Sequence, residues 1–179
     1  MSMIHKAYVF AYDEFTKELS EILEASLTTN NCEDLIGFIK RNITLLKNPN
    51  DWIPLTDAWE ASVEPKDAHQ YGNVALTKFY NPLEDIGLEY SWMDVDDLLQ
   101  EELFWRKSII LGHPVGSKNN YFDPGKLGSY FQSPERVLEN LDVLKDLLQT
   151  KPDLRTSLNQ VEVMLQEPAR LEKGLYVTF

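Results

Sequence analysis

The sequence predicts an α+β fold that is predominantly helical, with about five amphipathic helices and a small antiparallel sheet. Long stretches repeat apolar residues at spacings of three and four, which is the periodicity of a helix with one buried face. A few short segments are instead rich in β-branched and aromatic residues, as strands are. The length of 179 residues, of which 43% are hydrophobic, fits a single globular domain over 1–179.

The N-terminal part of the chain predicts a pair of helices. Residues 4–10 form a short strand or the lead-in to a helix, and residues 13–27 form an amphipathic helix. A second helix is predicted over 31–47, because it opens on a capping asparagine and is followed by Asn-Pro. The short polar turn between the two helices favours antiparallel packing. Residues 48–72 have weak periodicity and predict a loop with one short helix around 56–63.

The middle of the chain predicts a β-hairpin followed by a helix. Residues 73–80 alternate in polarity and are β-prone, and residues 87–92 can return as a second strand. Together they predict an antiparallel hairpin over 73–92. Residues 94–104 repeat apolar side chains on one face and predict a helix.

The C-terminal third begins with a glycine- and proline-rich segment, 112–132, which predicts a long ordered loop. Ser133 is a good capping residue and is followed by proline at the first helical position, so a helix starts there. Another helix opens at Pro152, and Pro168 is expected to stop it. The segment 175–179 predicts a terminal strand, which would join the hairpin as an edge partner.

The composition restricts the partners and the compartment. Lysine and arginine total 17 against 29 acids, which gives a net charge of −12 and a pI near 4.6. Such a charge repels nucleic acid and anionic membranes and attracts basic proteins. Cys32 is the single cysteine, so an intramolecular disulfide is excluded. The sequence shows no signal-peptide pattern and no long apolar run, so a cytoplasmic location without membrane association is expected.

The motifs that carry catalysis are missing from the sequence. It contains no G-x-S-x-G elbow, no paired His or Cys spacing of a zinc site, no P-loop and no G-x-G-x-x-G. We therefore assign no catalytic residue, no metal ligand and no cofactor, and expect a protein that is not an enzyme. The glycine-rich loop offers an alternative site built from His113, Lys118 and Tyr121. A His-Pro turn with a structural hydrogen bond is the simpler interpretation of His113.

An acidic belt fills the stretch 79–105, which contains no lysine or arginine. Its acids are Glu84, Asp85, Glu89, Asp94, Asp96, Asp97, Glu101 and Glu102. The aromatic residues between them are Tyr80, Tyr90, Trp92, Phe104 and Trp105. Repulsion among acids that lack basic partners lowers the stability of the folded chain. Such acids are useful if they attract and orient a cationic partner, and the neighbouring aromatic residues can anchor that partner. The predicted partner-binding residues are Glu84, Asp85, Glu89, Tyr90, Trp92, Asp94, Asp96, Asp97 and Glu101. A solvated helix face is the alternative interpretation.

At the level of class, the chain resembles bacterial toxin-immunity proteins. The resemblance lies in its size, its acidity, the belt from Glu84 to Glu102 with Tyr90 and Trp92, and the missing enzyme motifs. It implies a cytosolic antidote that covers the active site, or a nearby surface, of a basic nuclease-type toxin. Two alternatives remain open: a divalent-metal-dependent enzyme that uses the carboxylates from Asp94 to Glu102, and a structural subunit of a larger assembly.

Overall fold

The computed structural model describes residues 3–104 and 108–179 and has the predicted α+β fold, with 51% of the chain helical. Its main sheet is antiparallel and consists of β1 (Lys6–Phe10), β4 (Ser129–Gln132) and β5 (Gly174–Thr178), in the order β1-β5-β4. A separate two-stranded ribbon pairs β2 (Gly116–Ser117) with β3 (Asn120–Tyr121). Of the two alternatives left open for residues 4–10, a strand or the lead-in to a helix, the structure has the strand, β1.

The helices follow the predicted order in most of the chain. They are α1 (Tyr12–Phe15), which continues through a π-helical turn (Thr16–Ser20) into α2 (Glu21–Thr29), then α3 (Glu33–Asn42), α4 (Ala68–Leu76), α5 (Trp92–Glu102), α6 (Pro134–Thr150) and α7 (Arg155–Arg170). Short 3-10 turns occur at Trp59–Ser62 and Pro152–Leu154. None of the helices in the described residues combines the length and apolar character that crossing a lipid bilayer requires.

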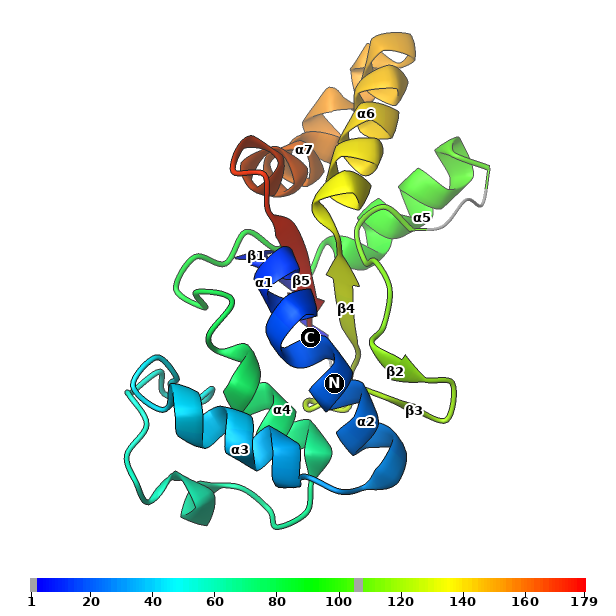
Figure 1. Cartoon of the computed structure of the whole chain (residues 1–179). Coiled ribbons are helices and arrows are strands. Elements are labelled where there is room, and N and C mark those ends of the chain that lie inside the picture. The colour runs from blue at the N-terminus through cyan, green and yellow to red at the C-terminus, as the bar shows by residue number, and fades with distance from the viewer. Residues whose placement is uncertain (1–2, 105–107) are drawn as a thin grey trace.

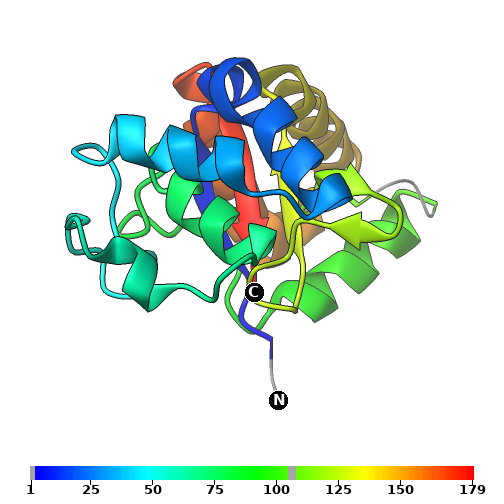
Figure 2. The same cartoon turned by 60° about the horizontal axis from the view of Figure 1, so that its bottom comes forward.

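The main sheet is covered on both faces, and alternate residues of its central strand enter two different cores. Leu175 and Val177 pack with α5, α6 and α7, whereas Tyr176 packs with Phe10 and Phe131 in the core formed by α1 to α4. Figures 1 and 2 show β5 in the middle, between these two groups of helices. A strand buried on both faces must be apolar at every position, as β5 nearly is.

The hairpin predicted over 73–92 is wrong, because the first half of its first strand, 73–76, is the end of α4 and the second half, 77–80, is not a strand. The helix starts at Asp67, whose carboxylate accepts hydrogen bonds from the backbone N–H groups of His69 (2.9 Å) and Gln70 (3.2 Å). Most of α4 is buried, so its sequence lacks the polar face that normally reveals a helix. Short apolar runs of this kind do not distinguish a helix from a strand.

The predicted second strand, 87–92, contributes only a single bridge, between Glu89 and His5. The terminal strand is real, but it is the centre of the sheet and not an edge partner of a hairpin. Its second partner, β4, lies inside the segment 112–132 that was predicted as loop. Pro168 does not stop α7, which runs on to Arg170.

Candidate functional site

The carboxylates of α5 separate into an outward and an inward set. The helix buries a narrow stripe that includes Val95 and Leu99, while Asp94, Asp97 and Glu101 are exposed. Residues three and four apart lie on one side of a helix, so these three acids form one row. Figure 1 shows α5 at the periphery of the molecule, on the other side of β4 from α1.

Large apolar side chains are exposed beside this acidic row. Tyr90 is 60% exposed, Met93 is 53% exposed and Phe104 is 88% exposed. Met93 lies one turn before Asp97 on the helix. Phe104 lies two residues beyond the helix, and its backbone N–H donates to the carbonyl of Glu101 (3.4 Å), so an exposed apolar side chain is found near each end of the row. We call this surface the α5 face, and it consists of Tyr90, Met93, Asp94, Asp97, Glu101 and Phe104. Within residues 3–104 and 108–179, its three acids form no ion pair.

Other acids of the predicted belt have structural partners. Asp96 is buried and accepts hydrogen bonds from the side chains of Ser108 (2.8 Å) and Gln100. Glu102 forms an ion pair with Lys151, which follows α6. The carboxylate of Asp85 accepts hydrogen bonds from the backbone N–H groups of Ala7 (3.0 Å) and Gly87 (2.9 Å). These three carboxylates stabilise the fold and do not belong to the α5 face.

The remaining predicted binding residues differ in exposure. Trp92 is half-buried: its indole N–H donates to the carbonyl of Met3 (3.1 Å), and its ring centre lies 4.8 Å from that of Phe179. Glu84 and Glu89 are exposed in the segment before α5. Trp105, an aromatic residue of the belt that was not among the predicted binding residues, lies outside the described residues. The belt is therefore not one uniform surface, and its solvent-facing acids are concentrated on α5 and in the segment before it.

The fully buried His5, which directly precedes β1, contacts the segments before and after α5. Its Nδ1 accepts a hydrogen bond from the backbone N–H of Leu88 (3.2 Å), which precedes the helix. Nδ1 is thus an acceptor, so Nε2 carries the proton and donates to the carbonyl of Ile110 (3.3 Å), which follows the helix. Burial lowers the pKa of His5 and keeps the ring neutral.

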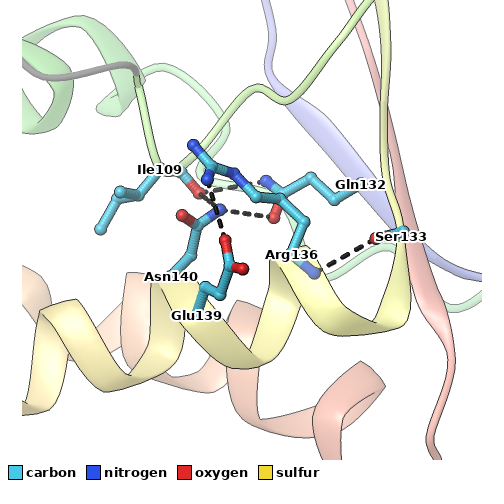
Figure 3. Close-up of polar contacts among 6 residues, drawn as sticks. All are labelled: Ile109, Gln132, Ser133, Arg136, Glu139 and Asn140. Carbon is cyan, nitrogen blue, oxygen red and sulfur yellow. Dashed lines mark hydrogen bonds and ion pairs between the residues drawn. The ribbon is translucent and has the colours of Figure 1, made fainter.

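A buried amide pair fixes the segment after α5 from the other side. Gln132 of β4 donates to the Ile109 carbonyl (3.0 Å), and Asn140 of α6 donates to the same carbonyl (3.4 Å) and to the Gln132 side-chain oxygen (2.8 Å). Figure 3 shows these contacts, together with the Ser133 cap on α6 and the Arg136–Glu139 pair. The α5 segment is thus tied to the sheet by polar contacts in addition to its narrow apolar stripe.

The alternative loop site is only partly assembled. His113 exchanges two backbone hydrogen bonds with Phe131 (2.9 and 2.8 Å), and its side chain is exposed. Lys118 is exposed in the turn of the β2–β3 ribbon. Tyr121 lines a hollow of about 240 Å³ together with Phe122 and other residues of that loop, but His113 and Lys118 are not among the described residues that line it. The structure therefore does not bring the three side chains into one site.

A hollow lined by several aromatic residues was not predicted from the sequence. A groove of about 400 Å³ lies on the uncovered end of the main sheet, and we call it the aromatic groove. It is lined by side chains that include Lys6, Tyr8, Trp52, Tyr80, Tyr176 and Thr178. Among the residues that line the groove, Trp52 has a strained backbone: its φ is 62°, and bulky residues rarely adopt a positive φ. No sequence pattern connects these residues.

The structure also locates the groups that were considered as metal ligands or nucleophiles. Among the described residues, no three His, Cys, Asp or Glu side chains converge closely enough to hold a metal ion. Cys32 is buried at the start of α3, and burial raises the pKa of its thiol.

The chain matches no protein-family model, no curated protein and no solved structure. Its function must therefore be argued from the geometry of the two surfaces, the α5 face and the aromatic groove.

Proposed function

We propose that this chain is a binding protein that captures a basic protein partner through the α5 face, and that it inhibits this partner as toxin-immunity proteins do. The observation that carries the proposal is the combination of acids and apolar side chains on one exposed face. Asp94, Asp97 and Glu101 form a row of charge next to Met93 and Phe104. Either feature alone is common on protein surfaces, but the combination is what an interface with a cationic partner requires.

The two kinds of side chain have different tasks in such an interface. Exposed apolar side chains gain free energy when a partner removes them from water, and they provide the anchors of an interface. The acids attract a cationic surface at long range and set its orientation. The net charge of −12 adds to this attraction and repels acidic proteins. The partner is therefore expected to be a protein with a basic patch that surrounds an apolar pocket.

The inhibitory part of the proposal rests on the class-level resemblance and on the location of the face. α5 lies at the edge of the molecule (Figure 1) and its outward acids are exposed, which suits insertion into a concave active site. A nuclease active site is lined with basic residues because it binds phosphates, so an acidic helix can occupy it in place of the substrate.

The experiment is affinity capture from the native cell, with identification of the bound protein and measurement of its affinity at low and high salt. The test variant carries Asp94→Asn, Asp97→Asn and Glu101→Gln. A matched control carries Glu21→Gln, Glu33→Gln and Asp34→Asn, which remove the same charge from exposed positions on α2 and α3. We expect the test variant to lose affinity roughly tenfold or more and the control to lose much less, because only the former removes the local contacts.

A second experiment tests inhibition separately from binding. The captured partner is expressed alone and together with the chain, and growth and nuclease activity are measured. We expect growth arrest by the partner alone and rescue by the wild-type chain but not by the α5 variant. An acidic partner, or a basic partner whose activity is unchanged in the complex, would contradict the proposal.

A further inference from the structure

The floor of the aromatic groove is a bare end of the main sheet. Lys6 and Tyr8 of β1 lie directly opposite Thr178 and Tyr176 of β5, and all four side chains line the groove. They share the face of the sheet that α1 to α4 cover further along the strands, because side chains two apart on a strand point to the same face. The groove is thus the part of this face that the helices leave open.

Aromatic rings from two loops form the walls of the groove. The ring centre of Tyr80 lies 5.0 Å from that of Tyr8, 5.2 Å from that of Tyr176 and 5.6 Å from that of Trp52. The ammonium group of Lys47 also contacts Trp52 and lies 4.8 Å from the centre of its ring. The backbone of Trp52 is strained, and strained residues of this kind are frequent at ligand-binding sites.

The hydroxyl of Tyr8 has no hydrogen-bond partner among the described residues, although the side chain is only 5% exposed. No fully enclosed side-chain nitrogen or oxygen in the described part of the chain lacks a partner, so this hydroxyl must reach solvent. The groove is the opening that Tyr8 lines. Burial raises the pKa of Tyr8 and of Tyr80, so both hydroxyls remain protonated and can donate hydrogen bonds.

We propose that the aromatic groove binds a small planar aromatic molecule that carries a hydrogen-bond-accepting group, such as a carboxylate or a carbonyl. The ring of the ligand stacks against Trp52 and Tyr80, and its acceptor group receives hydrogen bonds from Tyr8 and from Lys6. The volume of about 400 Å³ falls within the range of small-molecule sites and accommodates one or two fused rings. This site is independent of the α5 face.

The charges in the groove determine the choice of acceptor. Lys6 and Asp51 are the charged side chains among the described residues that line it. The carboxylate of Asp51 already accepts a hydrogen bond from the backbone N–H of Ile53 (3.0 Å), whereas Lys6 forms no ion pair with a described residue. The ammonium group of Lys6 and the hydroxyl of Tyr8 favour a ligand that accepts hydrogen bonds over a cationic ligand.

Ligand-detected NMR of the full chain tests the proposal with four probes: indole-3-carboxylate, indole, cyclohexanecarboxylate and tetramethylammonium. We expect saturable binding of indole-3-carboxylate, weaker binding of indole and none of the other two. Trp52→Gly removes the wall ring and relieves the strained φ, so the variant should fold, which circular dichroism verifies. It is expected to weaken binding of both indoles by roughly tenfold or more.

Two further variants separate the donor from the ring. Tyr8→Phe keeps the ring but removes the hydroxyl. It should weaken the binding of indole-3-carboxylate and leave the binding of indole unchanged. Tyr121→Phe, on β3 and outside the groove, is the matched control and should change neither. The proposal is overturned if no aromatic probe saturates up to about 5 mM. It is equally overturned if Trp52→Gly binds like the wild type, or if tetramethylammonium or cyclohexanecarboxylate binds as well as indole-3-carboxylate.

Discussion

The α5 face and the aromatic groove differ in shape, charge and origin. The α5 face is convex, acidic and formed by one helix with its immediate flanks, so its residues are neighbours in sequence. The groove is concave and aromatic, and its residues come from β1, β5 and the loops on either side of α4. A convex charged helix suits a protein surface, whereas a concave aromatic site suits a small molecule.

The two surfaces also differ in how much their residues contribute to the stability of the fold. Tyr8 and Tyr176, in the floor of the groove, are also members of the core, so the groove cannot be altered there without loss of stability. The outward acids of α5 are exposed and form no ion pair with a described residue, so we expect their substitution to change stability little. Binding and stability are thus separable on the α5 face but coupled in the groove, and the following predictions test this distinction.

The largest effect is expected from Tyr176→Ala. Tyr176 is 2% exposed and packs against Phe131, with ring centres 5.0 Å apart, and against Phe10 and Tyr8. Truncation of a buried aromatic residue leaves a cavity and should lower the free energy of unfolding by about 3–5 kcal/mol. Phe104→Ser on the α5 face is the counterpart and should change it by less than about 0.5 kcal/mol. Urea denaturation measures both, and similar losses would remove the distinction between the two regions.

The second largest effect is expected from His5→Phe, which affects the attachment of α5. The change leaves the N–H of Leu88 and the carbonyl of Ile110 without their buried partner, at a cost of roughly 2–4 kcal/mol. The variant should also be less sensitive to pH. Burial lowers the pKa of His5 below its ordinary value of 6.5, so the unfolded chain binds this proton more readily than the folded chain.

The sign of the pH effect follows from that difference. The stabilisation by neutral His5 is complete above pH 6.5 and is lost as the pH falls below 6.5 towards the lower pKa of the folded state. Urea midpoints of the wild type should therefore decrease between pH 6.5 and 5.5, and those of His5→Phe should decrease less. Equal slopes for the two proteins would show that His5 does not titrate in this way.

The two regions also differ in how far the sequence could predict them. The helix predicted over 94–104 is confirmed as α5, and helical periodicity alone makes Asp94, Asp97 and Glu101 neighbours on it. The inward direction of Asp96 depends on Ser108, whose location is determined only by the folded chain. Lys6 and Thr178 become neighbours through the pairing of β1 with β5, a register that no local pattern specifies.

The fold shows the same limit. The helices with one apolar face, such as α6 and α7, were found from their spacing and start signals. The helix α4 was missed because it is buried on most sides, and only the cap at Asp67 distinguished it from a strand. The strand β4 was missed because it is four residues long and its neighbouring segment is rich in glycine and proline.

An intermediate effect is expected from two adjacent aspartates on α5. Asp96→Ala removes the acceptor of the Ser108 hydroxyl at a buried position and should lower the free energy of unfolding by about 1–3 kcal/mol. Asp97→Ala removes an exposed carboxylate and should change it by less than about 0.5 kcal/mol. Urea denaturation of the two variants tests the division of the belt into inward and outward acids. Equal losses in the free energy of unfolding would contradict that division.

The smallest effect should have the opposite sign. Asp97 and Glu101 are four apart on α5, and like charges at this spacing destabilise a helix by about 0.2–0.5 kcal/mol. Glu101 also lies in the last turn, where the helix dipole disfavours negative charge. The double variant Asp97→Asn, Glu101→Gln should therefore be slightly more stable than the wild type, with a difference that shrinks as salt screens the repulsion. Thermal unfolding at low and high salt measures it. A less stable double variant would mean that these carboxylates have partners within the fold, and the α5 face would then lack the uncompensated charge on which its proposed function depends.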